Sequence, residues 1–455
     1  MNKNILTTQK EFYRTQATRS TDFRKSQLKK LKRVLKENES RMYEAIYLDF
    51  KKSEFDTYSS ELALIYAEIN DALNNLDYWS RTKRVGTNLL NFPAQSYIIP
   101  EPLGSCLVLG AWNYPYMLSI NPAVAALAAG CTVVLKPSEL PKNTSRVIAE
   151  MINDNFDIGF FHVIEGGVEE TTELINQKWD KIFFTGSVPV GKIIYQSAAK
   201  NLVPVTLELG GKSPAIVDET CNMAMSVKRL VWGKFMNSGQ TCISPDYVLV
   251  HKSVADQFVE QTIKEIEKSA YSFDNCNLVQ IINQKNLNRL KAMIDPKRVV
   301  HGGEVNEQER YISPTVMFPC SYDDVAMQEE IFGPILPVII YEDLDAAIQE
   351  INKREKPLAA YVFTKSKRVR KKVLSEISFG GGGVNETIMH IANSNLPHGG
   401  VGHSGLGTYH GEHGFRAFTH YKSIIDKPTW FELSLKYFPQ TPFKLKIVKQ
   451  IFRIK

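Results

Sequence analysis

The stretch SCLVLGAWNYPYMLSINPAVAALAAGCTVVLKPSE, residues 105–139, decides the fold. It holds two short apolar runs, CLVLG (106–110) and TVVLK (132–136), on either side of PAVAALAAG (122–130), a run of small residues that ends on glycine. Short apolar runs between turn signals are typical of buried strands, and the middle run favours a helix. The stretch therefore predicts a strand–helix–strand unit with parallel strands.

The same alternation continues along the chain on both sides of residue 210. Before that point, helical periodicity fills the first eighty residues, and the stretch 84–102 reads as a protruding hairpin. Repeated alternation of strands and helices predicts a mostly parallel sheet with helices on both faces, here in two α/β halves. The further segments are KIFFTG (181–186), PVGKIIYQSAAK (189–200), PVTLELGG (204–211), SPAIVD (213–218), YVLVH (247–251), a helix at 254–268, PILPVIIY (334–341), a helix at 343–353 and AAYVFT (359–364).

Composition narrows the class of protein. A chain of 455 residues with 43% hydrophobic and 23% charged side chains is globular, with roughly two or three domains. Its net charge of +6 equals the excess in residues 436–455, which hold six basic and no acidic side chains. A body without net charge argues against a nucleic-acid partner.

The cysteines and the N-terminus indicate the compartment. Six cysteines are scattered without a CxxC pair, so we expect neither a metal site nor a disulfide framework. The N-terminal MNKNILTTQKEFYRTQ is too polar for a signal peptide, and no window approaches about 18 uninterrupted apolar residues. A cytoplasmic protein is expected.

Two residues stand out as candidates for chemistry. Cys242, in GKFMNSGQTCISPDY, lies between a helical run and a strand, where a cysteine can act as a nucleophile or simply fill space in the core. Glu208 ends the strand of VTLELGG, where open α/β sheets bind ligands. A structural ion pair is the alternative for this carboxylate.

Three further segments follow predicted strands. The turn at Gly186 in FFTGSVPVGK offers backbone N–H groups to a pyrophosphate, although a turn without a ligand has the same sequence features. Asn113 in GAWNYPY is placed either to donate to an oxyanion or to cap the next helix. Lys136 and Glu139 in KPSE are placed to hold hydroxyl or phosphate groups, or to make surface contacts.

Taken in order, these segments resemble the aldehyde dehydrogenase superfamily from about residue 5 to 430. The similarity also includes EEIFGPILP (329–337) and the late glycine-rich LPHGGVGHSGLGTYHG (396–411). GAWNYP and SGLGTYHG are most similar to the class-3 branch, which contains fatty-aldehyde dehydrogenases. This resemblance implies an α/β fold with a Rossmann-type NAD(P)-binding domain (1–83 and 103–209), a catalytic domain (210–385), an oligomerisation arm (84–102 and 386–435) and a basic tail (436–455).

The resemblance also implies roles for single residues. Cys242 is then the nucleophile, Glu208 the general base and Asn113 the oxyanion donor. The residues expected to bind NAD, or alternatively NADP, are Lys136, Glu139, Gly186, Ser187, Gly191, Glu330 and Phe332. The residues expected to form an apolar substrate tunnel, each of which is otherwise ordinary core, are Tyr114, Met117, Trp232 and Met236.

Two histidines depart from the family pattern. His398 stands where phenylalanine is usual, and His403 where a small or amide residue is common. We expect neither to touch the catalytic set, so that they affect local packing and the mouth of the substrate site.

The implied reaction is the NAD(P)-dependent oxidation of a medium- or long-chain aliphatic or aromatic aldehyde to its acid. Cys242 forms a thiohemiacetal and then a thioester, which water activated by Glu208 hydrolyses; the thiol is activated by a helix N-terminus or by the positive nicotinamide. The alternatives are a CoA-acylating dehydrogenase and a non-catalytic structural descendant. The intact LELGG motif argues against the first, and the intact catalytic set argues against the second.

The C-terminal tail carries its own hypothesis. A helix from Phe443 would gather Phe443, Ile447, Ile451 and Ile454 on one side and basic residues elsewhere. Such segments lie on anionic membranes, pack on a partner subunit or stay disordered. We expect a homodimer from the resemblance, with weak contact of 436–455 with a membrane surface as the peripheral alternative.

Overall fold

The computed structural model describes residues 4–452, which divide into two compact units. Of these residues, unit 1 takes 4–79 and 102–419, and unit 2 takes 80–101 and 420–452. Residues 386–419, part of the expected oligomerisation arm, belong to unit 1. That segment is held there because β17 and α15 pair and pack with the first half of unit 1.

Helices fill the N-terminal part, as the apolar periodicity predicted. Leu28, Leu31, Val34 and Leu35 are fully buried or nearly so, on one side of the second helix. The five helices are α1 (Ile5–Arg14), α2 (Thr21–Glu37), α3 (Glu39–Phe50), α4 (Glu54–Thr57) and α5 (Ala63–Ser80).

The first half of unit 1 is built on a six-stranded sheet in the order β17-β7-β6-β3-β4-β5. All neighbours are parallel except β17, which runs antiparallel to β7. The strands are β3 (Ser105–Leu109), β4 (Thr132–Lys136), β5 (Phe161–Val163), β6 (Lys181–Thr185), β7 (Val205–Glu208) and β17 (Gly405–Leu406). The connecting helices are α6 (Met117–Ala129), α7 (Lys142–Asn153), α8 (Val168–Ile175) and α9 (Val188–Lys200).

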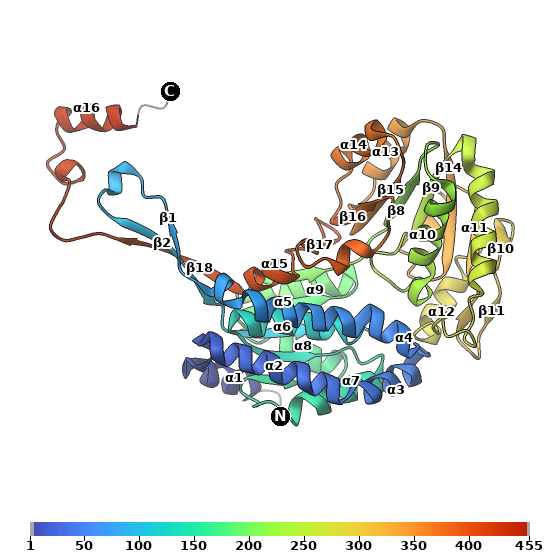
Figure 1. The fold of residues 1–455 in the computed structure, drawn as a ribbon, viewed down its shortest axis with the longest axis horizontal. Coiled ribbons are helices and arrows are strands. Elements are labelled where there is room, and N and C mark those ends of the chain that lie inside the picture. Colours follow the sequence, from blue (N-terminus) through green and yellow to red (C-terminus); the bar gives the residue numbers. More distant parts are fainter. Residues whose placement is uncertain (1–3, 453–455) are drawn as a thin grey trace. The chain divides into compact units, whose positions relative to one another are not determined.

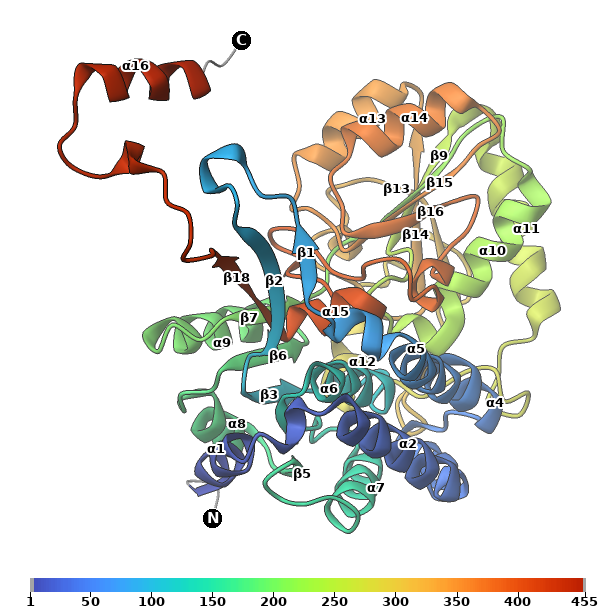
Figure 2. The same cartoon turned by 60° about the vertical axis from the view of Figure 1, so that its left-hand side comes forward.

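Helices cover both faces of this sheet (Figures 1 and 2). Successive residues of a strand point to opposite faces. Thus Cys106 and Val108 pack with α2, α5, α6 and α7, whereas Leu107 and Leu109 pack with α1, α8 and α9. This is the doubly covered parallel sheet that the alternating sequence predicted.

The second half of unit 1 has a seven-stranded sheet in the order β10-β13-β14-β9-β8-β15-β16, parallel except for β10. The strands are β8 (Pro214–Val217), β9 (Tyr247–His251), β10 (Val299–His301), β13 (Thr315–Cys320), β14 (Ile335–Tyr341), β15 (Ala359–Phe363) and β16 (Gly381–Val384), and a separate pair is β11 (Val305–Asn306) with β12 (Tyr311–Ile312). The helices are α10 (Met223–Phe235), α11 (Ala255–Ser269), α12 (Gln284–Lys291), α13 (Leu344–Asn352), α14 (Lys367–Glu376) and, packed on α6, α15 (Gly411–Ala417).

This sheet is also covered on both faces. Ala215 and Val217 of β8 pack with α10 and α11, and Ile216 packs with α12, α13 and α14. The chain therefore has the α/β architecture predicted, with two parallel-sheet halves that meet near residue 210.

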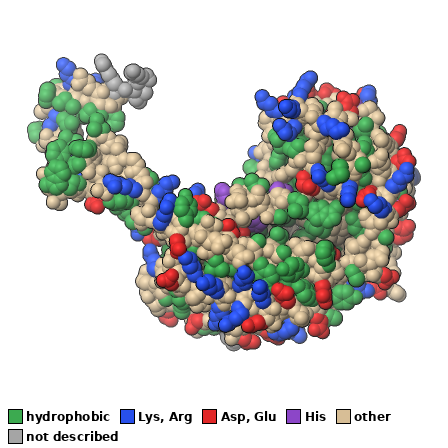
Figure 3. Space-filling view, viewed as in Figure 1, with side chains coloured by type: hydrophobic (Ala, Val, Ile, Leu, Met, Phe, Trp, Pro, Cys, Tyr) green, Lys and Arg blue, Asp and Glu red, His purple; other side chains and the backbone are tan. Residues whose placement is uncertain are grey.

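Unit 2 contains the predicted hairpin and the tail. β1 (Lys83–Val85) and β2 (Gln95–Pro102) form an antiparallel pair, and β18 (Thr419–Asp426) completes a three-stranded sheet. The expected tail helix is α16 (Pro442–Ile451), and Ile454 of the predicted apolar side lies outside the described residues. Phe438 and Phe443 are largely exposed, and hydrophobic side chains gather on the surface of this unit (Figure 3).

Within residues 4–452, no helix combines the length and the apolar content that crossing a bilayer requires.

Candidate active site

The carboxyl edge of the six-stranded sheet gathers most of the predicted residues. Glu208 ends β7, Gly186 follows β6, Asn113 follows β3 and Lys136 ends β4. These four strands are neighbours, and parallel strands end at one edge of the sheet. Residues far apart in sequence are thereby brought to the crevice where open α/β sheets bind ligands.

The loop with Cys242 faces this chemistry from the second half of unit 1. It follows α10 through a short 3₁₀ turn in which Asn237, Ser238 and Gly239 have φ of 54°, 52° and 71°. At Gly239 a Cβ atom would lie 2.2 Å from the Gly333 carbonyl oxygen, so this position requires glycine. The next regular element along the chain is strand β9.

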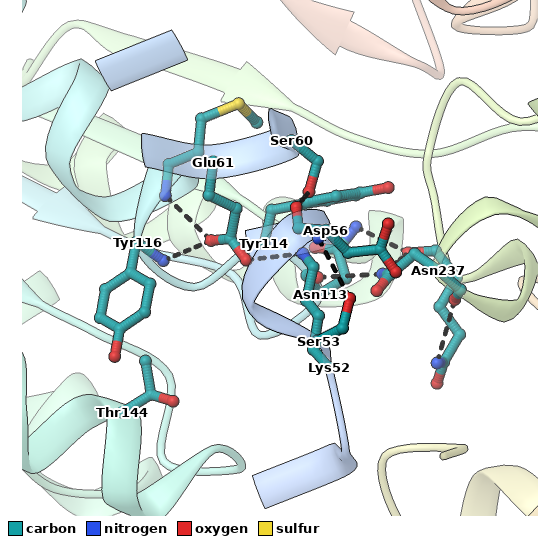
Figure 4. A network of polar contacts seen from close by, with 12 residues as sticks. Lys52, Ser53, Asp56, Ser60, Glu61, Asn113, Tyr114, Tyr116, Thr144 and Asn237 are labelled. Carbon is teal, nitrogen blue, oxygen red and sulfur yellow. Dashed lines mark hydrogen bonds and ion pairs between the residues drawn. The ribbon is translucent and has the colours of Figure 1, made fainter. Parts of the chain in front are cut away.

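Asn113 is held against the same loop by hydrogen bonds (Figure 4). Its Nδ2 donates to the Gln240 carbonyl oxygen at 3.1 Å, and Asn237 Nδ2 donates to the Asn113 carbonyl oxygen at 3.0 Å. Gln240 itself is fully buried; it donates to the Gln280 carbonyl oxygen at 3.0 Å and accepts from the Ile282 N–H at 3.1 Å. An amide has two N–H groups, so Asn113 keeps one for a ligand.

A buried ion pair supports the loop that carries Asn113. Lys52 Nζ lies 2.7 Å from Glu61 Oε1, and the two side chains are 1% and 0% exposed. The other Glu61 oxygen accepts from the N–H groups of Tyr116 and Met117, at 2.8 and 3.2 Å, where α6 begins (Figure 4). This carboxylate satisfies orphan donors at the start of the helix.

Tyr114 connects this ion pair to the nucleophile loop. Lys52 Nζ lies 4.2 Å from the centre of the Tyr114 ring, a cation–π contact. The Tyr114 hydroxyl lies 2.6 Å from Thr241 Oγ1, next to Cys242. Tyr114 and Met117 are buried in the hydrophobic core.

The electrostatics of the site favour neutral groups. Burial, with the charges of Glu330 and Glu208 added, raises the pKa of the Cys242 thiol to about 12. Burial raises the pKa of Glu208 well above its usual range, and raises that of Glu330, with the charge of Asp246 added, to about 8. Neither Glu208 oxygen has a hydrogen-bond partner. Perturbed groups of this kind cluster at functional sites.

Glu330 and Phe332 are held by a charge network that the sequence did not reveal. Lys212 pairs with Asp246 and donates to the Glu329 carbonyl oxygen at 2.8 Å, and Asp246 accepts from the Ile331 N–H at 2.9 Å. A Cβ atom at Gly210 would lie 2.0 Å from a Glu330 oxygen. The first glycine of LELGG, Gly210, thus makes room for this carboxylate.

Phe332 has a φ of 51° and its ring meets Trp112 edge to face, with the ring centres 5.3 Å apart. Trp112 directly precedes Asn113 in the sequence. The contact therefore links the predicted nicotinamide-side segment to the loop of the proposed oxyanion donor.

The remaining predicted cofactor residues lie in the segments that follow strands β4 and β6 or at their ends. Lys136 Nζ is buried and bonds Glu139 Oε2 at 3.0 Å, while Glu139 is half-exposed. Ser187 precedes α9 without capping it, and the neighbouring Thr185 hydroxyl is buried without a partner. Gly191 lets α9 approach β7, because a Cβ there would lie 2.7 Å from the Leu209 side chain.

The position of His398 differs from the expectation of the sequence analysis. It was expected not to touch the catalytic set, yet its Nε2 lies 3.8 Å from Glu208 Oε2, and both side chains are buried. The reason is the hairpin that carries it, whose strand β17 pairs with β7. His403, at the tip of that hairpin, lies 3.5 Å from Glu355 and is partly exposed.

A cavity of about 940 Å³ opens beside the nucleophile loop. Trp232 and Met236 line it, and it reaches Asn237, which bonds Asn113. Its other aromatic walls, which the sequence analysis missed, are Tyr43, Tyr47, Phe55 and Tyr271. The spacing of Tyr43 and Tyr47, four residues apart on one side of a helix, was the available signal. Among residues 4–452, no group of three His, Cys, Asp or Glu side chains is placed to hold a metal ion.

Comparison with known proteins gives a consistent result. The family model described as "Aldehyde dehydrogenase family" matches residues 2–424. The 4,4'-diaponeurosporen-aldehyde dehydrogenase of Staphylococcus aureus is 46% identical over 98% of this chain and 97% of its own length. Aldehyde dehydrogenase family 3 member A2 of Rattus norvegicus is 43% identical over 92% of this chain and 87% of its own.

A third relative, the "Aldehyde dehydrogenase, dimeric NADP-preferring" of Rattus norvegicus, is 42% identical over 96% of this chain and 97% of its own. Among solved structures, the substrate-bound state of Staphylococcus aureus AldH superposes with a TM-score of 0.96 and 44% identity, each chain covered in full. A Mycobacterium tuberculosis aldehyde dehydrogenase complexed with NAD+ gives a TM-score of 0.81 at 28% identity, over 90% of this chain and 86% of that one. With its parallel-sheet halves and its motifs at one edge, this chain belongs to the aldehyde dehydrogenase family and is an NAD(P)-dependent oxidoreductase of aldehydes.

Proposed function

We propose that this chain oxidises long apolar aldehydes, with Cys242 as nucleophile, Asn113 as oxyanion donor and Glu208 as general base. The proposed substrate class is supported by one observation, the cavity of about 940 Å³. Its walls include Trp232 and Met236, and its volume lies at the upper end of the range of about 300–1,000 Å³ found for ligand pockets. An elongated substrate has room there beside the nucleophile loop, with its apolar chain against the aromatic walls and away from the polar side of the cavity at Glu44, Glu54 and Asp56.

The cofactor side of the proposal rests on the carboxyl edge of the first sheet. The uncapped start of α9 at Ser187 and the unpartnered Thr185 hydroxyl fit a phosphate group, and the Lys136–Glu139 pair fits ribose hydroxyls. NAD(P) supplies a hydride acceptor and a positive nicotinamide ring when bound. We propose a preference for NAD, because the Glu139 carboxylate would repel the additional 2′-phosphate of NADP.

Each step of the proposed reaction is assigned to a residue of this chain. The Cys242 sulfur attacks the carbonyl carbon, and the second N–H of the Asn113 amide stabilises the oxyanion, a contribution of about 3–4 kcal/mol. After hydride loss, water attacks the thioester carbon while Glu208 takes its proton. The C–S bond breaks with its electron pair left on Cys242, and the acid is released.

We further propose a homodimer. One curated relative is named as dimeric, and unit 2 of this chain exposes Trp430, Phe438 and Phe443, which are 77%, 84% and 71% exposed. Apolar surface of this kind marks association sites. Sedimentation velocity checks it, and a monomer at micromolar concentration would contradict it.

The substrate proposal is tested with a panel of aldehydes from acetaldehyde to hexadecanal, with benzaldehyde, with NAD and NADP separately. The name of the Staphylococcus aureus relative adds 4,4'-diaponeurosporen-aldehyde to the panel. We expect kcat/KM to rise with chain length, and a Trp232→Ala variant to lose most of that rise. Turnover restricted to short or polar aldehydes would contradict the proposed substrate class.

The role of Glu208 is tested with Glu208→Gln. The thioester should still form, so one equivalent of reduced cofactor should appear in a burst, and intact-protein mass spectrometry should show an acyl adduct on Cys242. Full steady-state turnover by this variant would remove Glu208 from the base role.

A further inference from the structure

The cavity beside the nucleophile loop carries three carboxylates on its walls. Glu44 on α3 and Glu54 and Asp56 on α4 all line this space of about 940 Å³. Glu44 and Glu54 are exposed and stand at its mouth, whereas Asp56 is half-buried. Across the described part of the chain, none of the three forms an ion pair. Their charge is therefore not compensated by a neighbouring cation.

The lining of the cavity offers no free positive charge in return. Among the described residues that line it, Lys52 is the one cation. Its ammonium lies 2.7 Å from the Glu61 carboxylate, and its side chain is 1% exposed. Because Glu61 neutralises this charge inside the core, a ligand in the cavity meets a wall that is negative as a whole.

The two carboxylates of α4 stand among aromatic walls. Glu54 and Asp56 lie in the first turn of this helix, where the peptide dipoles favour negative charge. Burial raises the pKa of Asp56, and the charge of Lys52 opposes this rise. The charge of Glu54 reaches Tyr43 and that of Asp56 reaches Tyr271, and both rings line the cavity. Water screens charges less in such surroundings than on an open surface.

A separate observation indicates that this cavity takes a ligand. Asn237 lines its inner end and is 6% exposed. Its Nδ2 donates to the carbonyl oxygens of Asn113 and Gln240, at 3.0 and 3.1 Å, whereas its Oδ1 has no hydrogen-bond partner. A buried acceptor without a partner is costly, so this end of the cavity calls for a bound molecule that supplies a donor.

We propose that Glu44, Glu54 and Asp56 form a charge filter, which admits aldehydes whose far end is neutral or cationic and excludes those whose far end is a carboxylate. The proposal rests on the proposed function, in which the substrate chain occupies this cavity while its carbonyl carbon lies at Cys242. The three side chains select the substrate and stay away from the reacting atoms.

The filter acts through the field inside the cavity. A cleft lined by charges of one sign, with walls of low polarity, changes the entry rate of a charged ligand by about 10–10³-fold. A carboxylate at the far end is repelled by this field. A quaternary ammonium is attracted by the same charges and by the faces of rings such as Tyr43 and Tyr47. A neutral end experiences neither effect, so that selection depends on charge at equal length.

The test uses three aldehydes with the same ten-carbon chain. One ends in a carboxylate, one in the methyl ester of that carboxylate and one in a trimethylammonio group. The value of kcat/KM is measured for each with saturating NAD, in the wild-type chain, in Glu44→Gln, Glu54→Gln and Asp56→Asn, and in the triple variant. The neutral ester is the reference, because dividing by its kcat/KM cancels any change in folding or in the chemical steps.

A second triple variant is the matched control. Glu11→Gln, Asp22→Asn and Asp154→Asn remove the same charge from exposed positions outside the cavity lining. This variant separates the field inside the cavity from the net charge of the whole chain.

In the wild-type chain, kcat/KM for the carboxylate should be about tenfold or more below that for the ester. The triple variant of the filter should raise the carboxylate-to-ester ratio about tenfold and lower the trimethylammonio-to-ester ratio, whereas the control variant should change neither. Added salt should shift the wild-type ratios in the same directions, since it screens the field.

Equal kcat/KM for the carboxylate and the ester in the wild-type chain would overturn the filter, and so would ratios that the triple variant leaves unchanged. The proposed function fails by a different result, namely turnover of neutral aldehydes that does not improve with chain length. The filter is measured at a single length, so the two failures are distinguishable.

Discussion

The Lys52–Glu61 ion pair offers a quantitative test of how the site is supported. Both side chains are essentially inaccessible to solvent, and their charged atoms lie 2.7 Å apart. Replacing Lys52 with Met leaves the Glu61 carboxylate buried, with the Tyr116 and Met117 N–H groups as its remaining partners. Breaking a buried pair in this way costs about 3–5 kcal/mol, so Lys52→Met should be destabilised by that amount.

The assay is urea unfolding at a fixed protein concentration, followed by tryptophan fluorescence and circular dichroism. The matched control is Lys252→Met, which breaks an ion pair of similar length, 2.8 Å to Glu342, between side chains that are 55% and 72% exposed. Solvated pairs of this kind contribute about 0–1 kcal/mol. The two variants therefore differ in the burial of the pair that they break.

A double variant tests whether the uncompensated Glu61 charge causes the destabilisation of Lys52→Met. Adding Glu61→Gln to Lys52→Met removes the uncompensated charge and keeps an oxygen for the Tyr116 and Met117 N–H groups, so the double variant should be more stable than Lys52→Met alone. The reasoning is refuted if Lys52→Met costs no more than Lys252→Met, or if the double variant loses the full sum of both single changes.

Three other predictions follow from the site and the tail. Asn113→Ala should lower kcat by about 10²–10³-fold with cofactor affinity unchanged, because one oxyanion donor is lost; stopped-flow kinetics and cofactor titration check this, and an unchanged kcat would count against the donor role. In cofactor-free enzyme, alkylation of Cys242 by iodoacetamide should rise about tenfold per pH unit from pH 7 to 10, since a thiol with a pKa of about 12 is protonated throughout that range; peptide mass spectrometry follows the modified cysteine, and a plateau near pH 8 would contradict the raised pKa. Removing residues 436–455 should abolish any sedimentation with vesicles containing anionic lipid while leaving turnover unchanged, and failure of the intact chain to sediment would end the membrane hypothesis.

The sequence by itself determined the architecture and the reaction class of this protein. Strand–helix alternation is local information, because burial on both faces requires short apolar runs and amphipathic helices wherever they lie in the chain. The motifs around Cys242 and Glu208 indicated the family for the same reason, since each is a few neighbouring residues. The sequence analysis missed β16 because three of its four residues are glycine, which is depleted in strands. It forms where Gly382 must approach the Ala360 backbone closely.

Tertiary structure alone decided which residues meet. The contact of His398 with Glu208 depends on β17 pairing with β7, nearly two hundred residues away in sequence. In the same way, the contact of Glu61 with the Tyr116 N–H at the start of α6 joins residues 55 positions apart. Ionisation of buried groups is set by these long-range neighbours and by exclusion of water, neither of which a local stretch of sequence contains.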